Sequence, residues 1–355
     1  MTALKAGATI GILGGGQLGR MLGSAAAALG FDVSIYCPEE DCPAARVAAR
    51  HIIGAYSDMQ ALLAWAETCD AITYEFENVP VEAAEALIAA GALVRPGAKP
   101  LEVSQDRVVE KSFLRACGIQ TADFAQIDVA SDVAAPIEQF GGKGILKTRR
   151  DGYDGKGQAR LELGDDYEAA HKALKHAPSI LEAMVPFELE VSVIVARDRA
   201  GKSMCFDIPR NEHINGILKR SVVPSELPEE VADRACEAAK TLADALDYVG
   251  VLALEFFVLA DGTLLANEFA PRVHNSGHWT PEACAAGQFE QHIRAVAGWP
   301  LGPVTRYHDV EMLNLLGEEA LVPPEVLSAD GVLTLYGKRD AKPGRKMGHL
   351  VRRRS

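Results

Sequence analysis

The N-terminal stretch constrains the fold of this chain more than any other segment. Residues 8–37, ATIGILGGGQLGRMLGSAAAALGFDVSIYC, read as an apolar strand, a glycine-rich turn, an alanine-rich helix and a second apolar strand. Two neighbouring parallel strands need a long crossover connection, which is usually a helix, whereas a tight turn joins antiparallel strands. A strand–helix–strand order therefore indicates parallel strands. A further strand is predicted in DAITYEFENVP, residues 70–80, and strands alternate with helices to about residue 104. This part therefore predicts an α/β, Rossmann-like domain with a parallel sheet.

The rest of the chain predicts two further domains, because 355 residues exceed what one core usually holds. Residues 144–270 are strand-rich and are interrupted by one long helix, which favours an α+β arrangement. A Pro/Gly cluster, GWPLGP, marks the start of a third piece. We expect a parallel-sheet domain at 1–104, a central domain at 105–298 and a small β-rich domain at 299–355.

Charge and cysteine usage exclude several function classes. The net charge of −13 repels nucleic acid and anionic membranes. The longest uncharged run lies between Lys5 and Arg20 and is too short to span a membrane. Seven cysteines without a C-x-x-C pair predict neither a disulfide framework nor a zinc site, and they favour a reducing cytoplasm. Residues 338–354 carry eight Lys and Arg against Asp340 alone, either as a solvated tail or as part of an anion site.

The turn Gly14–Gly19 has the spacing G-x-G-x-x-G between a strand and a helix. Such glycines let the backbone approach a phosphate at a helix N-terminus. A nicotinamide dinucleotide also needs an acidic residue at the end of the second strand, but that strand ends in Tyr36-Cys37-Pro38. A mononucleotide or sugar phosphate fits better, and a purely structural turn remains open.

A second glycine-rich loop, KTRRDGYDGKGQAR at residues 147–160, gathers five cations around three glycines. It lacks the G-x-x-x-x-G-K-[ST] spacing of a Walker P-loop. Its backbone N–H groups can still wrap phosphates, with Lys147 as a point charge at the strand end. A surface hairpin with solvated cations is the alternative.

A carboxylate pair emerges from counting across Asp261-Gly262, which predicts a two-residue type I′ hairpin turn. In that register Glu255 lies opposite Glu268, among Phe257, Leu259, Leu264 and Ala266. Two opposed carboxylates on an apolar face repel each other, and a bound Mg²⁺ would relieve the repulsion. A shifted register and a shared-proton pair are the alternatives.

The cationic loop and this hairpin, without a Walker motif, resemble the ATP-grasp superfamily. GILGGGQLGRML, YEFENVP, KTRRDGYDGKGQ, NEFAPRVHNSGHWT and GRKMGHL resemble one family within it, the 5-(carboxyamino)imidazole ribonucleotide synthases of purine biosynthesis. The resemblance spans nearly the whole chain. It implies an ATP-grasp fold with an N-terminal Rossmann-like domain and a small C-terminal β-rich domain. It also implies ATP and two Mg²⁺ ions as cofactors.

The resemblance implies an ATP site between two sheets, with residues 151–158 as a mobile phosphate-covering loop. Glu255 and Glu268 match the metal ligands, although the Asn that many ATP-grasp sequences place two residues after the second Glu is replaced by Ala270. The ATP-contacting candidates are Arg107, Lys147, Gly152, Tyr153, Asp154, Gly155, Lys156, Gly157, Gln158, Glu182, Ala183, Met184, Val185, Glu190, His213, Asn267 and Glu268.

The implied reaction is the ATP-dependent carboxylation of aminoimidazole ribonucleotide by bicarbonate through carboxyphosphate. The candidate catalytic residues are Arg272, Asp154 and Lys147, and a chemical or structural role for His278 stays open. The candidate substrate-binding residues are Gly16, Gln17, Leu18, Glu77, Tyr153, Asp154, Arg272, His274, Asn275, Lys338 and Arg345. A cytoplasmic homodimeric ligase is expected. Competing hypotheses are a formate-using transformylase, a nicotinamide-dependent dehydrogenase and a nucleotide sensor.

Overall fold

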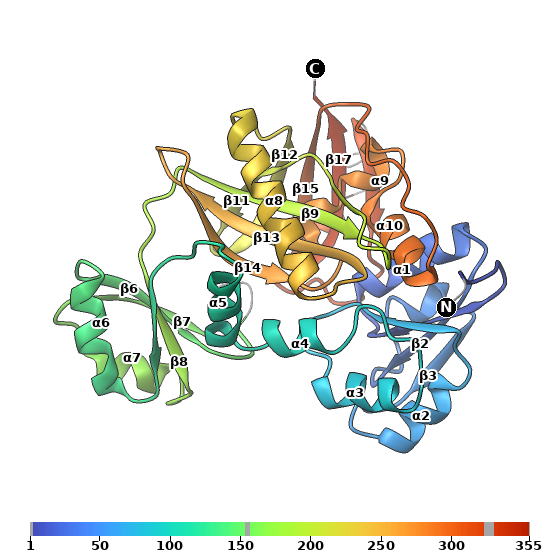
Figure 1. The fold of residues 1–355 in the computed structure, drawn as a ribbon, viewed down its shortest axis with the longest axis horizontal. Helices are drawn as coiled ribbons and strands as arrows, with labels where there is room; N and C mark the ends of the chain where they lie inside the picture. The colour runs from blue at the N-terminus through green and yellow to red at the C-terminus, as the bar shows by residue number, and fades with distance from the viewer. Residues whose placement is uncertain (1–2, 153–156, 323–329, 355) are drawn as a thin grey trace.

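The structure is a computed structural model that describes residues 3–152, 157–322 and 330–354. Its first sheet has the order β3-β2-β1-β4, and all three strand pairs are parallel, as the N-terminal pattern predicts. Helices α1, α2 and α3 pack around this sheet (Figure 1). The elements are β1 Thr9–Leu13, α1 Gln17–Ala28, β2 Asp32–Cys37, the 3-10 turn Ala45–Val47, β3 Arg50–Ile53, α2 Met59–Ala66, β4 Ala71–Tyr74 and α3 Val81–Ala89.

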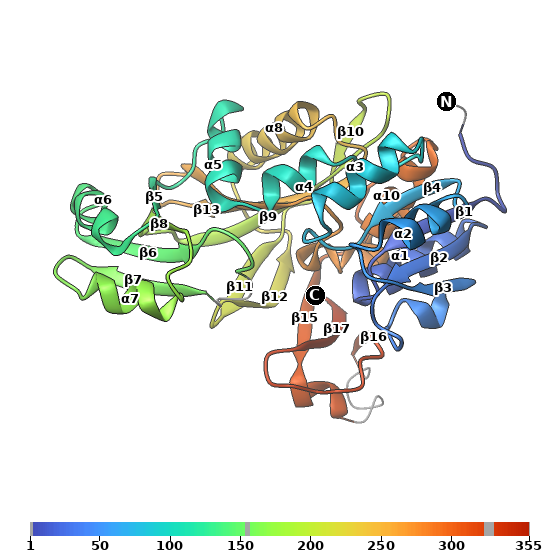
Figure 2. The same ribbon diagram turned by 90° about the horizontal axis from the view of Figure 1, so that it is seen from below.

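A small antiparallel sheet of order β5-β8-β6-β7 forms a separate lobe, at the left of Figures 1 and 2. Helices α4 and α5 connect the first domain to this lobe. The elements are α4 Lys99–Ser104, α5 Arg107–Ala116, β5 Phe124–Ile127, the 3-10 turn Ala130–Val133, α6 Ala134–Gln139, β6 Lys143–Thr148, β7 Gln158–Glu162, α7 Tyr167–Ala173 and β8 Ser179–Ala183.

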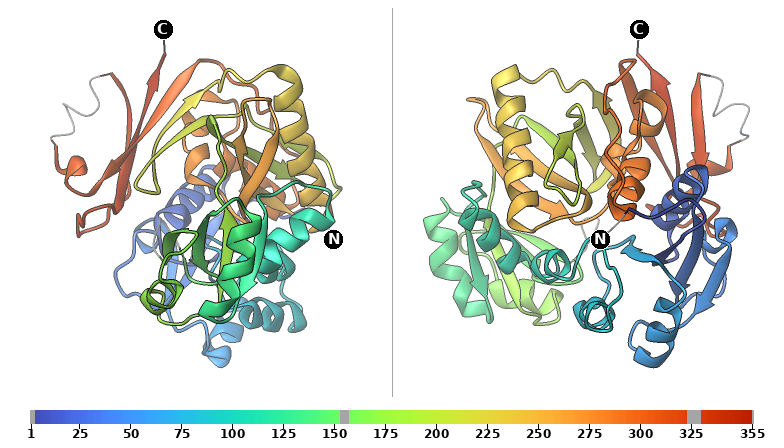
Figure 3. Two further views of the ribbon diagram at one scale, coloured as in Figure 1. Left: turned by 90° about the vertical axis from the view of Figure 1, so that its left-hand side faces the viewer. Right: turned by 45° about the vertical axis from the view of Figure 1, so that its right-hand side comes forward.

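A nine-stranded sheet of order β14-β13-β9-β11-β12-β15-β17-β16, with β10 beside β9, forms the centre of the molecule. The C-terminal strands continue this sheet, because β15 pairs with β12 (Figure 3). The strands are β9 Leu189–Arg197, β10 Ser203–Cys205, β11 Arg210–Ile214, β12 Ile217–Val223, β13 Gly250–Val258, β14 Leu264–Ala270, β15 Val310–Leu316, β16 Gly331–Leu335 and β17 Lys346–Arg353. The helices are α8 Glu229–Ala245, α9 Thr280–Ala283 and α10 Gln288–Ala297, with 3-10 turns at Asn275–Gly277 and Gly317–Leu321.

The β13–β14 hairpin corrects the predicted turn. Val258 pairs with Leu264 and the Leu259 amide meets the Thr263 carbonyl, so the loop has three residues rather than two. Gly262 takes the left-handed φ of +78° that such a loop needs. The shifted register places Leu264 and Ala266 on the face opposite to Phe257, where they pack in the core with Val258. The predicted apolar surroundings of Glu255 were therefore partly wrong.

A β-bulge restores the predicted pairing at the carboxylates. Leu254 pairs with Phe269 and Phe256 with Ala266, so Asn267 and Glu268 together oppose Glu255. The loop is one residue longer than predicted, and the extra residue of the bulge compensates for this shift in register.

One hydrophobic cluster joins the first domain to the central sheet. It contains residues of β1, β2 and α1 together with residues of β9, β13 and α10. Burial of this shared surface fixes the glycine turn relative to the central sheet. No helix among the described residues is long and apolar enough to cross a membrane.

Candidate active site

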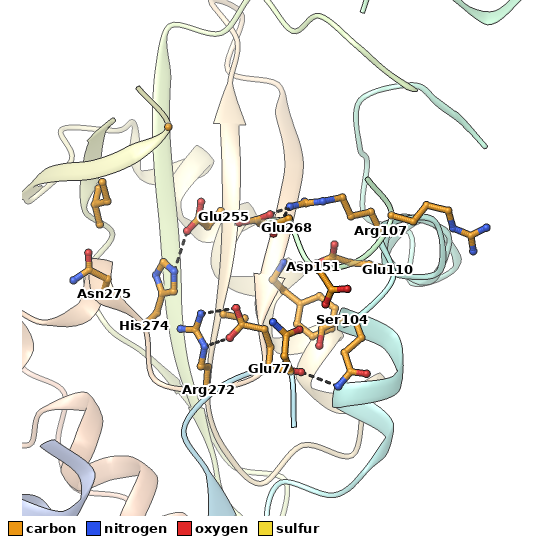
Figure 4. A pocket seen from close by; sticks show the side chains of 18 of the residues that line it. Glu77, Ser104, Arg107, Glu110, Asp151, Glu255, Glu268, Arg272, His274 and Asn275 are labelled. Atoms are coloured by element: carbon orange, nitrogen blue, oxygen red, sulfur yellow. Dashed lines mark hydrogen bonds and ion pairs between the residues drawn. The ribbon is translucent and has the colours of Figure 1, made fainter. Parts of the chain in front are cut away.

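A polar cavity of about 190 Å³ opens where the three parts of the chain meet (Figure 4). Its lining residues come from the segment after β4, from α5, from the hairpin β13–β14 and from β17. Its lining includes the predicted residues Glu77, Arg107, Gly152, His213, Glu255, Glu268, Arg272, His274 and Asn275. The structure thus brings together predicted residues that are up to 198 positions apart in the sequence, from Glu77 to Asn275.

The carboxylates Glu255 and Glu268 face the cavity with different partners. Arg107 Nη1 donates to Glu268 Oε2 at 2.8 Å, and its Nη2 donates to the Gly152 carbonyl at 3.2 Å. Arg107 is the first residue of α5, whose N-terminus is capped by the Asp106 carboxylate. The cap sets the start of the helix and thereby aims Arg107 at the hairpin.

Charge separates the pKa values of the two carboxylates. Removal from water raises the pKa of Glu255 to about 7, and repulsion by Glu268 adds to this rise. Partial removal from water also opposes ionisation of Glu268, but the charge and hydrogen bond of Arg107 outweigh it and lower the pKa of Glu268 to about 2. A divalent cation between them would favour ionised Glu255, and two carboxylates are ligands that Mg²⁺ prefers. The donor set therefore fits Mg²⁺.

Glu255 is positioned by a hydrogen-bond chain that crosses the central sheet. His274 Nε2 lies 3.2 Å from Glu255 Oε1, and His274 Nδ1 lies 2.8 Å from Ser276 Oγ. The Ser276 amide donates to Nδ1, which assigns the ring proton to Nε2 and makes that nitrogen the donor to Glu255. Burial and the charge of Arg272 lower the pKa of His274 to about 3, so the ring is neutral.

The chain continues inward from Ser276. Ser192 Oγ donates to Ser276 Oγ at 2.6 Å, Asn211 Nδ2 donates to Ser192 Oγ at 3.0 Å, and Ser221 Oγ donates to Asn211 Oδ1 at 2.8 Å. All of these serines and the asparagine are buried. Such a satisfied network fixes one rotamer for each member and so holds His274 against Glu255.

A second cluster of cations lies between the small sheet and the hairpin. Lys147 on β6 and Lys111 on α5 approach Glu182 Oε2 on β8 at 3.0 and 3.3 Å. Burial and the neighbouring cations Lys111 and Arg107 lower the pKa of Lys147. Glu182 Oε1 is buried and has no hydrogen-bond partner among the residues that the structure describes. An unsatisfied acceptor beside two ammonium groups is a site for a polar ligand.

Other residues predicted to contact nucleotide lie on or just beyond the neighbouring strands. Ala183 is the last residue of β8, and Met184 beyond it is exposed. Glu190 on β9 forms a hydrogen bond with His213 on β11, which raises the pKa of His213 against the effect of burial. Gln158 begins β7 and pairs with Lys147.

Arg272 forms a bidentate pair with Glu77. Its Nε donates to Glu77 Oε2, and its Nη2 donates to Glu77 Oε1 at 3.0 Å. Burial opposes ionisation of Glu77, but the charge of Arg272 lowers its pKa to about 2. The two predicted substrate residues therefore hold each other at the cavity wall, with part of the Arg272 fork turned to the Val273 carbonyl.

The glycine turn contains a side chain that sequence reasoning missed. The Glu75 carboxylate accepts from the Gly16 amide at 2.6 Å and from the Gly19 amide at 2.9 Å. A Cβ at Gly14 would lie 2.3 Å from Glu75 Cγ, so the glycine is required by this carboxylate. An internal acid thus takes up amides expected to face a phosphate.

The basic tail enters the cavity at one residue. Lys346, the first residue of β17, lines the cavity, whereas Lys338 and Arg345 are not among its lining residues. Lys338 Nζ donates to the Lys346 carbonyl at 2.8 Å, and Arg345 Nη1 donates to the Asp340 carbonyl at 3.0 Å. The tail reaches the first domain through Arg46, which donates to the Gly337 carbonyl.

Other predicted residues do not line the cavity or lie outside the residues that the structure describes. Tyr153, Asp154, Gly155 and Lys156 lie outside the described residues. Asn267 sits in the bulge, where its carbonyl accepts from Lys111 at 3.0 Å. His278 is buried against Gln288, His349 and Tyr336 and does not line the cavity, which favours its structural role.

Glu110 is a buried carboxyl group of the cavity wall that the sequence did not reveal. It is buried beside Glu268 and accepts from the Phe269 amide at 2.7 Å. Burial, with repulsion by Glu268, raises its pKa to about 8. Only its place one turn along α5 from Arg107 hinted at such a position, because helical residues three apart share a face.

Comparison with known proteins matches three family models in order along the chain. They are the ribonucleotide synthetase preATP-grasp domain at residues 7–105, the ATP-grasp domain at residues 112–289, and the phosphoribosylaminoimidazole carboxylase C-terminal domain at residues 311–352. The ATP-grasp model alone covers half of the chain.

Curated relatives and solved structures agree with these matches. The chain is 56% identical over 354 residues to the N5-carboxyaminoimidazole ribonucleotide synthase of Brucella melitensis, covering 99% of this chain and 98% of that one. Identity to the Bacillus subtilis synthase is 41%, covering 97% and 91%. A synthetase solved with ADP superimposes with a TM-score of 0.95 at 41% identity, covering 99% and 94%. An Aspergillus clavatus synthase solved with ADP and 5-aminoimidazole ribonucleotide superimposes with a TM-score of 0.90 at 30% identity, covering 98% and 94%.

Proposed function

Because this chain belongs to the N5-carboxyaminoimidazole ribonucleotide synthases, ATP-grasp ligases also called 5-(carboxyamino)imidazole ribonucleotide synthases, we propose how its own residues perform the reaction. The enzyme carboxylates 5-aminoimidazole ribonucleotide at the expense of ATP in purine biosynthesis. We assign bicarbonate as the carbon source, carboxyphosphate as the activated form and the cavity between the hairpin and the first domain as the reaction site.

The single observation that carries this assignment is the position of Glu255 beside Glu268, which is ion-paired with Arg107, at one cavity wall. Two carboxylates with pKa values of about 7 and about 2 suit a divalent cation, which would neutralise phosphate charge when bound. Arg107 and Lys147 then supply positive charge to the same phosphates. We expect ATP to lie between the small sheet and the hairpin, with its base near Glu182, Ala183, Met184 and Val185 and its ribose near Glu190 and His213.

Activation of bicarbonate requires a cation beside the phosphoryl group. A bicarbonate oxygen attacks the γ-phosphorus, the bond to the bridging oxygen breaks, and ADP leaves. Arg272 lies next to the hairpin and is fixed by Glu77, which suits it to hold the anion in line. The fixed charges stabilise the transition state without reorganisation.

Carboxyl transfer follows at the same wall. The exocyclic amine attacks the carboxyl carbon, phosphate leaves with the bridging oxygen, and the proton lost by the amine passes to the departing phosphate. His274, neutral and hydrogen-bonded to Glu255, and Asn275 border this space. Tyr153 and Asp154 stay candidates for contact with the amine.

The phosphate of the ribonucleotide is assigned to the gap between the basic tail and the glycine turn. The hydrogen bond from Arg46, in the 3-10 turn Ala45–Val47, to the Gly337 carbonyl joins the tail to the first domain, and Arg20 on α1 lies beside Gly337. Lys338, Arg345 and Lys346 supply charge from the tail, and Gly16, Gln17 and Leu18 supply the opposite wall. The amides of Gly16 and Gly19 already donate to Glu75, so side chains and the other backbone amides of this wall would contact the phosphate.

We further propose a homodimer in the cytoplasm. The seven cysteines are all free, which suits a reducing compartment. Light scattering on the purified enzyme measures the assembly directly, and a monomer at micromolar concentration would contradict it.

The assignment of bicarbonate is tested by ADP release coupled to a spectroscopic assay. Release should require both 5-aminoimidazole ribonucleotide and bicarbonate, and formate should not replace bicarbonate. Formate-dependent release without bicarbonate would instead indicate a transformylase.

A further inference from the structure

A cluster of two cysteines and one histidine lies behind the glycine turn. Cys37 ends β2, Cys42 lies in the connection that follows, and His51 is on β3. Cys37 Sγ is 3.3 Å from Cys42 Sγ and 3.3 Å from His51 Nε2, and Cys42 Sγ is 4.0 Å from that nitrogen. Within the described parts of the chain, these are the three ligand-type side chains whose atoms gather within 4.8 Å.

The three distances match the edges of a tetrahedral metal site. With metal–sulfur bonds of about 2.3 Å and metal–nitrogen bonds of about 2.0–2.1 Å, ligand atoms lie about 3.6–3.8 Å apart. Each distance in the cluster is within about 0.5 Å of that range. Two thiols and an imidazole are borderline-soft ligands, unlike the carboxylates of the cavity. We propose that Cys37, Cys42 and His51 bind one Zn²⁺ ion, with a fourth position left for water.

The sheet explains why the sequence did not reveal this site. The spacing from Cys37 to Cys42 is C-x₄-C rather than C-x-x-C, so the cysteines alone predicted no zinc site. His51 pairs in parallel register with Ile35, two residues before Cys37. Alternation therefore puts the His51 and Cys37 side chains on one face of neighbouring strands.

The cluster is coupled to the turn that faces the substrate. A Cβ at Gly15 would lie 2.6 Å from Cys42 Sγ and 2.7 Å from Cys37 Sγ, so both sulfurs pack directly on the turn. The Ala44 amide also donates to the Gly15 carbonyl at 3.1 Å. A bound ion would tie β2, β3 and the turn together, giving the site a structural role.

Binding is measured on the full chain with Co²⁺ as a spectroscopic probe and Zn²⁺ as competitor. The protein is kept reduced, and millimolar Mg²⁺ occupies the carboxylate site. We expect one Co²⁺ per chain with a thiolate-to-cobalt charge-transfer band and tetrahedral visible bands, both lost when Zn²⁺ is added. Zn²⁺ at 100 times its Kd should favour the folded state about 100-fold and raise the melting temperature.

Variants decide whether these residues are the ligands. Cys42→Ser and His51→Gln should each lose the charge-transfer band or shift it and weaken Zn²⁺ binding at least tenfold. Cys69→Ser is the matched control, because its part-buried thiol is in the same domain and contacts the Trp65 carbonyl instead. The proposal is overturned if the reduced wild type binds no more Co²⁺ or Zn²⁺ than His51→Gln, if Cys69→Ser loses binding equally, or if a Cys37–Cys42 disulfide persists under reduction.

Discussion

Replacement of Glu268 by Gln removes one negative charge from the cavity while keeping the shape of the side chain. Arg107 loses its ionic partner at 2.8 Å, and the predicted cation site loses one of two carboxylates. We expect turnover to fall about 10²–10³-fold, equivalent to about 2.7–4 kcal/mol, as when one fixed electrostatic group is removed from a transition state.

The same change should leave the fold nearly intact. The Glu268 side chain is 43% exposed, so solvent screens its pair with Arg107, and loss of the pair costs about 0.2–1 kcal/mol. Removal of the charge also relieves repulsion on Glu255, which offsets part of that cost. The melting temperature should therefore change by no more than about 4 °C.

Steady-state ADP release at saturating Mg²⁺ and thermal unfolding measure the two effects. Glu311→Gln is the matched control, because it removes a comparable ion pair with Arg220 at 2.6 Å on β15, outside the cavity. Near-normal turnover of Glu268→Gln, or an equal loss in the control, would refute the assignment of the cation site.

Three further outcomes are expected. The Mg²⁺ affinity should be about tenfold weaker at pH 6 than at pH 8, because a Glu255 with a pKa of about 7 must lose its proton to bind metal, and equal affinities would contradict this. Lys346→Ala and Arg345→Ala should each raise the Michaelis constant for the ribonucleotide about 10- to 150-fold through loss of about 1.5–3 kcal/mol, and a change confined to ATP would move the tail into the nucleotide site. Gly14→Ala should lower the urea midpoint of unfolding far more than Gly91→Ala. Both glycines have a positive φ, but only the Cβ at position 14 would meet a buried carboxylate. Equal effects of the two substitutions would show that backbone strain alone matters.

The hairpin shows how far local pattern reasoning extends. Asp261-Gly262 correctly located the turn, and Glu255 does oppose Glu268. The predicted loop was one residue too short, and a bulge at Asn267 and Glu268 compensates for the difference in register. Bulges depend on packing against a partner strand, so no local sequence signal located this one.

Long-range contacts explain most of what the sequence did not reveal. The glycine turn was identified by its spacing, but the carboxylate that fills it comes from Glu75, 59 residues later. The charge excess of the tail was evident, yet which of its cations lines the cavity depends on where β17 starts. Glu110 likewise looks like an ordinary helical acid until α5 packs against β14.

Transfer of an oxygen atom tests the central claim most directly. With bicarbonate labelled with oxygen-18 and 5-aminoimidazole ribonucleotide present, the phosphate released should carry one labelled oxygen per turnover, because a bicarbonate oxygen attacks the γ-phosphorus and stays with it. Unlabelled phosphate, with the carboxylated ribonucleotide still formed, would contradict phosphorylation of bicarbonate in this cavity.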